Sequence, residues 1–156
     1  MTSSRLAKSS LIIICSIFLI NCGIHPFDET QVPNITIVDK SVPTISWTPT
    51  NAYQLLIFEG KYKGDYRDTQ KSIWAVRAKN YANEMSPPIN YSEFNSNLNY
   101  LVQGRPVTSA DDFLPLTVGK YYTVAINRKD PEGIGDGFSS TYKKYVGVKV
   151  FKLLLK

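Results

Sequence analysis

Short segments in which apolar and polar residues alternate are the feature of this sequence that most restricts its fold. Six of them lie at residues 34–38, 44–48, 53–59, 72–78, 120–128 and 142–152. Alternation with a period of two indicates strands with one buried face. Glycine, proline, asparagine and aspartate gather between the segments and provide turns. Regularly spaced short strands without a strong helical pattern predict an all-β fold, an antiparallel sandwich.

Residues 80–118 fit this pattern least well, because only 99–103 and 115–118 are strand candidates there, and both are weak. Residues 60–72 and 80–104 lie between the clearer strand candidates, so we expect loops there. Large loops on a rigid scaffold commonly carry the residues that bind ligands. Any binding site is accordingly expected in these loops.

Two motifs make the fold prediction more specific. In VPTISWTP (42–49), Ile45 and Trp47 alternate with polar residues between two prolines. Further along, the spacing L-x-x-G-x-x-Y-x-V-x-I is formed by Leu116, Gly119, Tyr122, Val124 and Ile126. Both motifs resemble strands of fibronectin type III domains, an immunoglobulin-like β-sandwich family. The resemblance implies that Trp47 fills the space between the sheets and that the Tyr122 hydroxyl bonds to backbone just upstream, near Leu116. It also implies that the loops at 60–72 and 80–104 are enlarged relative to a minimal module.

The N-terminus has the features of an export signal. Arg5 and Lys8 precede an uncharged apolar run from Leu11 to Ile20. A membrane-spanning helix needs about 20 apolar residues, so this run is too short to span. A basic segment followed by a short apolar segment is typical of a secretory signal.

The end of this signal resembles the lipobox of bacterial lipoproteins, in Leu19, Ile20 and Cys22, although Asn21 stands where that family usually has a small residue. The resemblance implies cleavage before Cys22 and attachment of lipid to it, including an acyl chain such as palmitate. We therefore assign residues 1–21 to a signal peptide, 22–32 to a lipidated tether and 33–156 to the fibronectin type III-like domain. An ordinary secretory signal with an incidental cysteine is the alternative.

Cysteine and histidine counts exclude several kinds of site. Cys15 lies in the signal, so Cys22 is the one cysteine of the mature chain, and a disulfide framework is excluded. The single histidine, His25, falls in the tether, so the domain has no Ser-His-Asp triad and no zinc site built from histidine and cysteine. We expect no cofactor.

Charge gives no support to nucleic-acid binding. The chain has 18 basic and 13 acidic residues, and removal of Arg5 and Lys8 with the signal leaves 16 basic residues against those 13. An exported protein with this modest excess has little access to nucleic acid. The basic residues near the C-terminus are spaced through a strand, which is typical of an edge strand protected against pairing.

Acidic residues provide two further candidate sites. Asp130, Glu132 and Asp136 in DPEGIGDG (130–137) are weak calcium candidates, because glycine occupies a ligand position of the EF-hand pattern, and a plain turn is favoured. A second acidic set, a candidate for acid/base chemistry, consists of Glu93, Asp111 and Asp112, and solvated loop charges are favoured there.

Tyrosines are numerous enough to form a binding surface. Several fall in predicted loops or near strand ends, namely Tyr62, Tyr66, Tyr81, Tyr91, Tyr100, Tyr142 and Tyr145. An amphipathic ring of this kind stacks on a sugar or anchors a protein contact. Scattered surface tyrosines are equally ordinary in β-rich proteins, so no tyrosine site is assigned.

These features together predict a lipid-anchored protein of the bacterial cell envelope that binds or assembles and is not an enzyme. Its expected partners are membrane lipid through Cys22 and a protein or glycan ligand through the loops. Gly23 differs from the aspartate that resembles an inner-membrane retention signal, which favours the outer membrane or cell surface. The alternatives are an accessory carbohydrate-binding module and, third, a carboxylate- or metal-dependent hydrolase.

Overall fold

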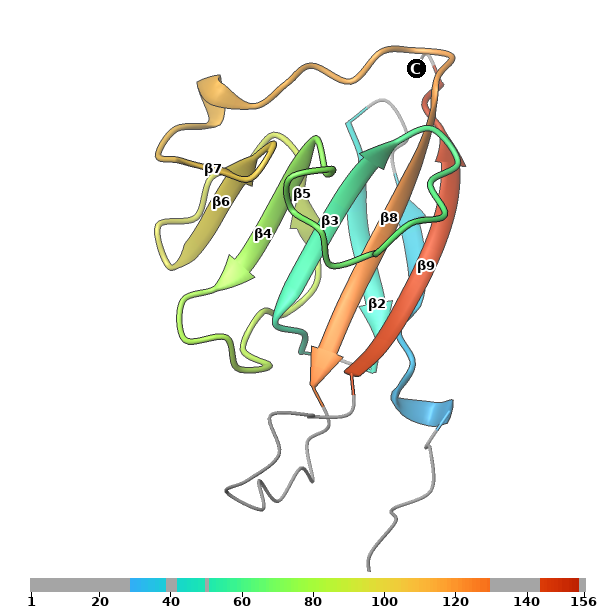
Figure 1. Cartoon of the computed structure of the whole chain (residues 1–156), viewed down its shortest axis with the longest axis vertical. Helices are drawn as coiled ribbons and strands as arrows, with labels where there is room; N and C mark the ends of the chain where they lie inside the picture. Colours follow the sequence, from blue (N-terminus) through green and yellow to red (C-terminus); the bar gives the residue numbers. More distant parts are fainter. Residues whose placement is uncertain (1–28, 39–41, 50, 130–143, 155–156) are drawn as a thin grey trace, which may run out of the picture.

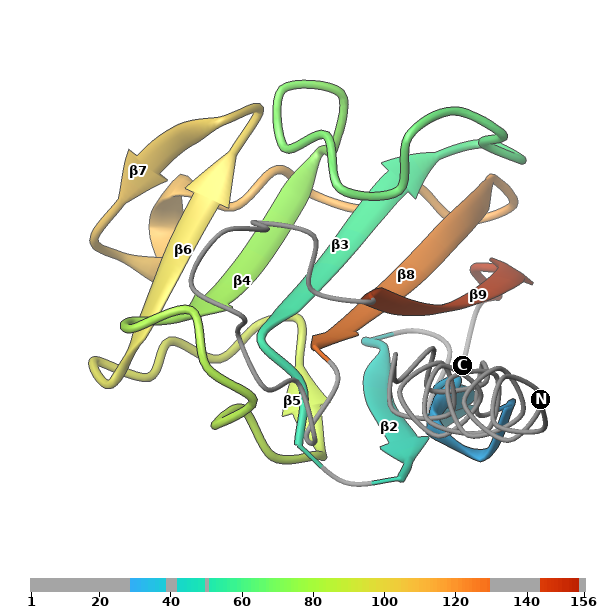
Figure 2. The same cartoon turned by 60° about the horizontal axis from the view of Figure 1, so that its bottom comes forward.

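Two antiparallel sheets make up the chain in the computed structural model, which describes residues 29–38, 42–49, 51–129 and 144–154 (Figure 1). The smaller sheet has the order β1 (Asn34–Val38), β2 (Thr44–Thr48), β5 (Ile89–Asn90). The larger sheet has the order β7 (Arg105–Val107), β6 (Leu98–Val102), β4 (Trp74–Ala78), β3 (Gln54–Glu59), β8 (Tyr121–Lys129), β9 (Lys144–Lys152), which runs from left to right across Figure 2. Two short 3₁₀ helices, η1 (Glu29–Gln31) and η2 (Ala110–Asp112), complete the described elements. The predicted antiparallel β-sandwich is confirmed, and no helix in these ranges is long and apolar enough to cross a membrane.

The core lies between the sheets and is formed by the inward residues of the alternating strands. Trp47 of β2 is 2% exposed and shares one buried cluster with Ile45 of its own sheet and with Val124 and Ile126 of β8. Trp74 of β4 is fully buried in the same cluster. Three aromatic rings surround Trp74, with ring centroids 5.1 to 5.9 Å away, and these belong to Tyr91, Tyr100 and Phe113. Burial of large apolar side chains on this scale is the main force that holds the sheets together.

Residues 80–118, which fitted the strand pattern least well, contain a hairpin formed by β6 and β7. Predicted strand 99–103 corresponds to β6, which turns into β7 through Gln103 and Gly104. Both turn residues have positive φ, 50° and 77°, as a two-residue hairpin turn of the primed type requires. Since β6 pairs with β4, the hairpin extends the larger sheet by β6 and by β7, and the sequence did not predict β7.

The predicted strand at 115–118 is wrong. Residues 114–117 carry no strand pairing, and Val118 and Gly119 form a turn before β8. Pro115 has no N–H to donate to a ladder, and the Thr117 N–H donates to the Tyr122 hydroxyl at 2.7 Å instead of to a strand. Gly119 has a φ of +83°, which fits a turn and not an extended strand.

Residues 60–73, which include the enlarged loop expected at 60–72, cross the outer face of the larger sheet and cover it. The ring of Tyr62 stacks on Phe58 at a centroid distance of 4.1 Å, and Tyr66 packs edge-on to Phe58 at 6.3 Å. The Tyr62 N–H donates to Thr123 Oγ1 at 2.9 Å, and Asn127 Nδ2 donates to the Tyr66 carbonyl at 3.0 Å. We call this segment the outer cover. It forms a second, smaller hydrophobic cluster over β3, β4 and β8.

The N-terminal part of the described chain is fixed to the sandwich. Arg128 Nη1 donates to the carbonyl and to Oε1 of Gln31, at 3.2 and 2.9 Å, and Arg128 Nε donates to the Asn51 carbonyl at 2.7 Å. Residues 29–32, which the sequence assigned to the tether, therefore contact β8. Just beyond them, the Pro33 carbonyl oxygen lies where a Cβ on Gly147 would stand, 1.9 Å from that ideal position, so only glycine allows this approach.

Candidate binding groove

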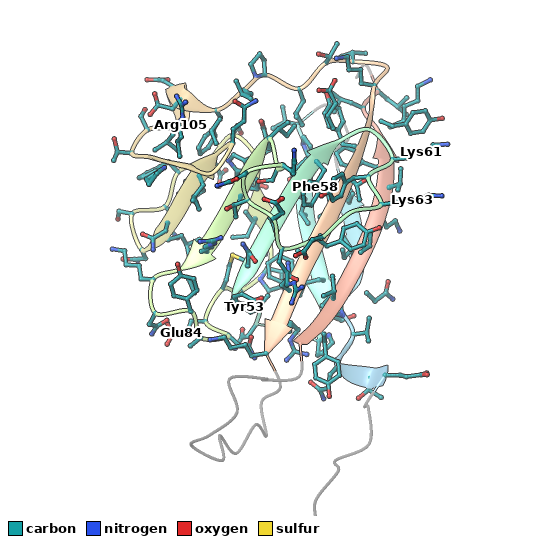
Figure 3. All side chains as sticks on the ribbon, in the orientation of Figure 1. Tyr53, Phe58, Lys61, Lys63, Glu84 and Arg105 are labelled. Carbon is teal, nitrogen blue, oxygen red and sulfur yellow. The ribbon has the colours of Figure 1, made fainter. Side chains whose placement is uncertain are left out.

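A groove of about 380 Å³ opens at the end of the sandwich where η1 lies, between β5 and the β4 and β6 strands. It lies at the lower end of Figure 1, and Glu84 marks it in Figure 3. Its volume falls within the range of small-ligand sites, about 300–1,000 Å³. The lining residues are Ala78, Lys79, Glu84, Met85, Ser86, Pro88, Ile89, Asn95, Asn97 and Leu98.

One wall of the groove is the β4–β5 connection, which is fixed to the rest of the fold at two points. Asn83 Nδ2 donates to the Lys129 carbonyl at 2.7 Å, and the Lys129 N–H donates back to Asn83 Oδ1 at 2.9 Å. Met85 and Ala52 exchange two backbone hydrogen bonds of 2.9 Å. Paired bonds of this kind hold a connection in one conformation, so the wall is formed before any ligand arrives.

The opposite wall is the β5–β6 connection, which is organised around Asn95. The Asn95 N–H donates to the Tyr100 hydroxyl at 3.1 Å, while Asn95 Oδ1 accepts from the Asn97 N–H and the Asn95 carbonyl accepts from the Leu98 N–H, both at 2.9 Å. An asparagine that bonds backbone two residues ahead forms a compact turn. The turn places Asn95 and Asn97 among the residues that line the groove.

The chemistry of the groove combines polar groups with an apolar floor. Lys79 and Asn97 make no side-chain hydrogen bond or ion pair within the described ranges. Glu84 Oε1 accepts from Asn80 Nδ2 at 2.6 Å, which leaves Oε2 available. Half-buried Ile89 and Leu98 provide apolar surface. This lining suits a small polar ligand that has hydroxyl or amide groups and one apolar face.

The groove contains one carboxylate, that of Glu84, whereas glycoside hydrolysis by acid and base uses two. No group of three or more histidine, cysteine, aspartate or glutamate residues that could hold a metal occurs in the part of the chain that the structure describes.

Two residues singled out from the sequence have structural roles away from the groove. Trp47 is in the core, and the Tyr122 hydroxyl accepts a hydrogen bond from the backbone N–H of Thr117, the residue after Leu116. Neither lines the groove. The remaining predicted site residues, in the lipidation, calcium and histidine assignments, lie outside the described residues, namely Cys22, His25, Asp130, Glu132 and Asp136.

The candidate acid/base carboxylates do not contribute to the groove. Asp111 and Asp112 are exposed in η2, where Ser109 Oγ accepts from the Asp111 N–H at 3.1 Å and caps the helix. Glu93 is exposed in the β5–β6 connection and is not among the lining residues.

The tyrosines are not gathered on one surface. Tyr62 and Tyr66 belong to the outer cover, whereas Tyr91, Tyr100 and Tyr145 are buried. Tyr81 is 50% exposed and contacts the Arg77 guanidinium. Tyr142 lies outside the described ranges.

Sequence reasoning did not identify the groove residues, although it placed function in the segment that provides most of them. The signal was a concentration of asparagines at 80, 83, 90, 95, 97 and 99, with two consecutive prolines at 87 and 88. Asparagine and proline set tight turns, and asparagine also brings amide groups that bind ligands. A segment rich in asparagine and proline identifies a binding site only once the fold shows that two of its turns face each other.

Comparisons of the chain with protein-family models, with curated proteins and with solved structures found no match.

Proposed function

We propose that this chain is a lipid-anchored binding module of the bacterial cell envelope, which recognises a small polar group of a protein or glycan and carries out no reaction on it. The observation that carries the proposal is the groove, whose walls are held by backbone bonds, while the side chains of Lys79 and Asn97 make no hydrogen bond or ion pair in the described ranges. Preformed polar groups that are not used by the fold are what a binding site requires.

The sequence supports the anchoring part of the proposal. Arg5 and Lys8, the short apolar run and the Leu19-Ile20 pair before Cys22 form the pattern of a lipoprotein signal. Lipid on Cys22 would give stable attachment, because each buried CH₂ contributes about 0.8 kcal/mol and two or three chains act together. The absence of aspartate after Cys22 favours the outer membrane or the cell surface.

A fibronectin type III-like identity is part of the proposal. It is supported by the burial of Trp47 between two sheets and by the hydrogen bond between Tyr122 and the backbone of Thr117. The β6–β7 hairpin and the outer cover would then be additions to a smaller parent module.

A carbohydrate ligand is the second candidate, favoured by the amide groups of Asn95 and Asn97 on one wall. Side-chain amides provide a donor and an acceptor side by side, which matches vicinal hydroxyls or an N-acetyl group. Binding of neutral oligosaccharides would support this candidate, and binding of blocked peptides would support a protein ligand.

Anchoring is tested by expressing the chain in a diderm bacterium and analysing the membrane-derived protein by mass spectrometry. We expect an N-terminal peptide that begins at Cys22 and carries acyl chains. Cys22→Ser should move the domain out of the membrane fraction or leave an uncleaved precursor, and Cys15→Ser should change nothing. An unmodified N-terminal residue, or cleavage after Cys22, contradicts the anchoring.

Ligand binding is tested separately with the full chain in detergent, by titration with neutral oligosaccharides and with blocked dipeptides and tripeptides. Asn97→Ala and Lys79→Ala should each weaken any binding by about tenfold, since each removes one polar contact of about 1–2 kcal/mol. The matched control is Lys71→Ala, an exposed lysine outside the groove, which should have no effect. Binding that is indifferent to Asn97 and Lys79 would show that the groove is not the site.

A further inference from the structure

The edges of the two sheets differ sharply in how they are protected. Among the described strands, the edge positions belong to β1, β5, β7 and β9. β5 has two residues and follows a Pro87-Pro88 pair, β7 has three residues including Pro106, and β1 has five residues after Pro33. β9 has nine residues and no proline. Short strands and prolines prevent pairing with other chains. β9 is the longest described edge strand and contains no proline, and Pro33, just before β1, packs against its Gly147.

The outer face of β9 is also left bare by the outer cover. Val148 and Val150 are 41% and 43% exposed, whereas Ala125 and Thr123, which are paired with them on β8, are fully buried. The outer cover packs on β3, β4 and β8, and its cluster includes no residue of β9. An apolar strip therefore lies between the cover and the free edge of the larger sheet.

Lysines lie near this strip on the outer face, whereas Lys149 lies on the opposite face of β9, since it is paired with the core residue Val124. Lys61 Nζ and Lys152 Nζ lie 4.7 and 5.8 Å from the ring centroid of Tyr121, which is itself 43% exposed. Lys61 and Lys63 point away from the ribbon (Figure 3). No carboxylate lies within 4.0 Å of these lysines or of Lys149 in the described ranges, where the ion pairs are Arg67–Asp65 and Lys120–Glu59.

We propose that β9 is a docking edge for an extended acidic segment of a partner protein, which pairs as a further antiparallel or parallel strand of the larger sheet. The free backbone groups of the edge would provide the hydrogen bonds, the Val148–Val150 strip would take apolar side chains, and the lysines would pair with carboxylates. This surface is separate from the groove and does not depend on the lipid anchor.

A second copy of this chain is a poorer occupant. β9 carries lysine and no acidic residue, so pairing of two copies along this edge sets lysines against lysines. Charge opposition of this kind is a common way to prevent sheet edges from pairing with themselves. The lysines of β9 do not oppose pairing with a strand that carries acidic residues.

The test uses the full chain in detergent and three blocked, fluorescent peptides of the length of β9. The first alternates glutamate with valine, the second alternates lysine with valine, and the third repeats the first with every second backbone nitrogen methylated. Anisotropy should show binding of the first peptide alone, because methylation removes the donors of a ladder while leaving charge and side chains in place. Equal binding of the methylated peptide shows plain charge attraction and overturns the proposal, as does failure of the first peptide to bind.

Variants then locate the site. Lys149→Glu with Lys152→Glu should weaken binding of the glutamate peptide by about tenfold or more and make it insensitive to salt. The double variant Val148→Thr with Val150→Thr keeps strand propensity and should weaken binding of the glutamate peptide by a smaller factor than the lysine variant does. The charge-matched control is Lys71→Glu, in the segment beside Gln70 and Gly104 at the β7 side of the sheet, which should leave binding unchanged. A concentration-dependent dimer of the chain alone, abolished by Lys149→Glu, would overturn the choice of partner.

Discussion

Arg128 and Gln31 are 97 residues apart in sequence and are joined by two hydrogen bonds from one guanidinium nitrogen, at 2.9 and 3.2 Å. Arg128 is 6% exposed, has no carboxylate partner within 4.0 Å in the described ranges, and its pKa is lowered by burial. Its charge is therefore compensated by peptide and amide oxygens. The pair links the first described residues of the chain to the penultimate strand.

Arg128→Ala should lower the free energy of unfolding by about 2–4 kcal/mol, because the carbonyls of Gln31 and Asn51 lose a charged donor. Gln31→Ala is the matched control and should cost about 1 kcal/mol, since only the side-chain acceptor is removed. Urea titration followed by tryptophan fluorescence measures both. Equal losses for the two variants would show that the backbone contacts of Arg128 do not stabilise the fold.

Tyr122→Phe should cost about 1 kcal/mol, because the Thr117 N–H loses its acceptor while the packing against Phe151 is kept. The neighbouring substitution Tyr121→Phe removes a hydroxyl from an exposed ring and should change stability by less than about 0.5 kcal/mol. The difference between the two variants in urea isolates the hydrogen bond. No difference would mean that the bond contributes nothing net.

Trp47→Ala should lower the free energy of unfolding by about 3–5 kcal/mol, because it leaves a cavity between the sheets. Val118→Ala, at a 45% exposed position, is the surface control and should cost less than about 0.5 kcal/mol. Chemical denaturation compares them. A loss below about 1 kcal/mol for Trp47→Ala would place this ring outside the cooperative core.

Stability should fall at alkaline pH. Burial raises the pKa of Tyr91 above its usual value of 10.0, with a smaller contribution from Tyr122, and burial also raises the pKa of Tyr53 and Tyr100. The folded state therefore holds protons that the unfolded chain releases, so the stabilisation is complete below pH 10 and is lost as pH rises above it.

Tyr91→Phe tests this pH dependence. The variant should be less stable than the parent chain at neutral pH, because the Leu114 carbonyl loses the Tyr91 hydroxyl donor. It should lose less further stability between about pH 9 and pH 11. Parallel slopes for the two proteins over this range would contradict the assignment.

Local patterns predicted the strands well where one face is buried and the other is polar. NITIV and TISWT became β1 and β2 with the bounds read from the alternation, and the central strands were placed to within two residues. β6 was weak in sequence because its outward residue Leu101 is also partly buried, under the outer cover, which blurs the alternation.

The groove was beyond sequence reasoning for a different reason. Its walls come from segments whose order along the chain says nothing about their separation in space. Asn95 lines it because the Tyr100 hydroxyl fixes the turn, and Lys79 lines it because β4 ends there. Long-range pairing between β4 and β6 sets both positions. The outer cover was missed similarly, because Tyr62 and Tyr66 resemble exposed loop tyrosines until Phe58 is known to face outward.

The position of β8 determines when the sandwich can close during synthesis. β8 lies between β3 and β9 in the larger sheet and also holds Gln31 through Arg128, yet of the described strands only β9 is made after it. Ile57 of β3 pairs with Val124 of β8, and Ile35 of β1 packs in the same core cluster as residues of β8 and β9. Neither residue can complete its contacts until those two strands have been made. Contacts of such long sequence separation make folding slow. The sandwich is therefore expected to remain open, with apolar strands unpaired, until β8 and β9 have been made.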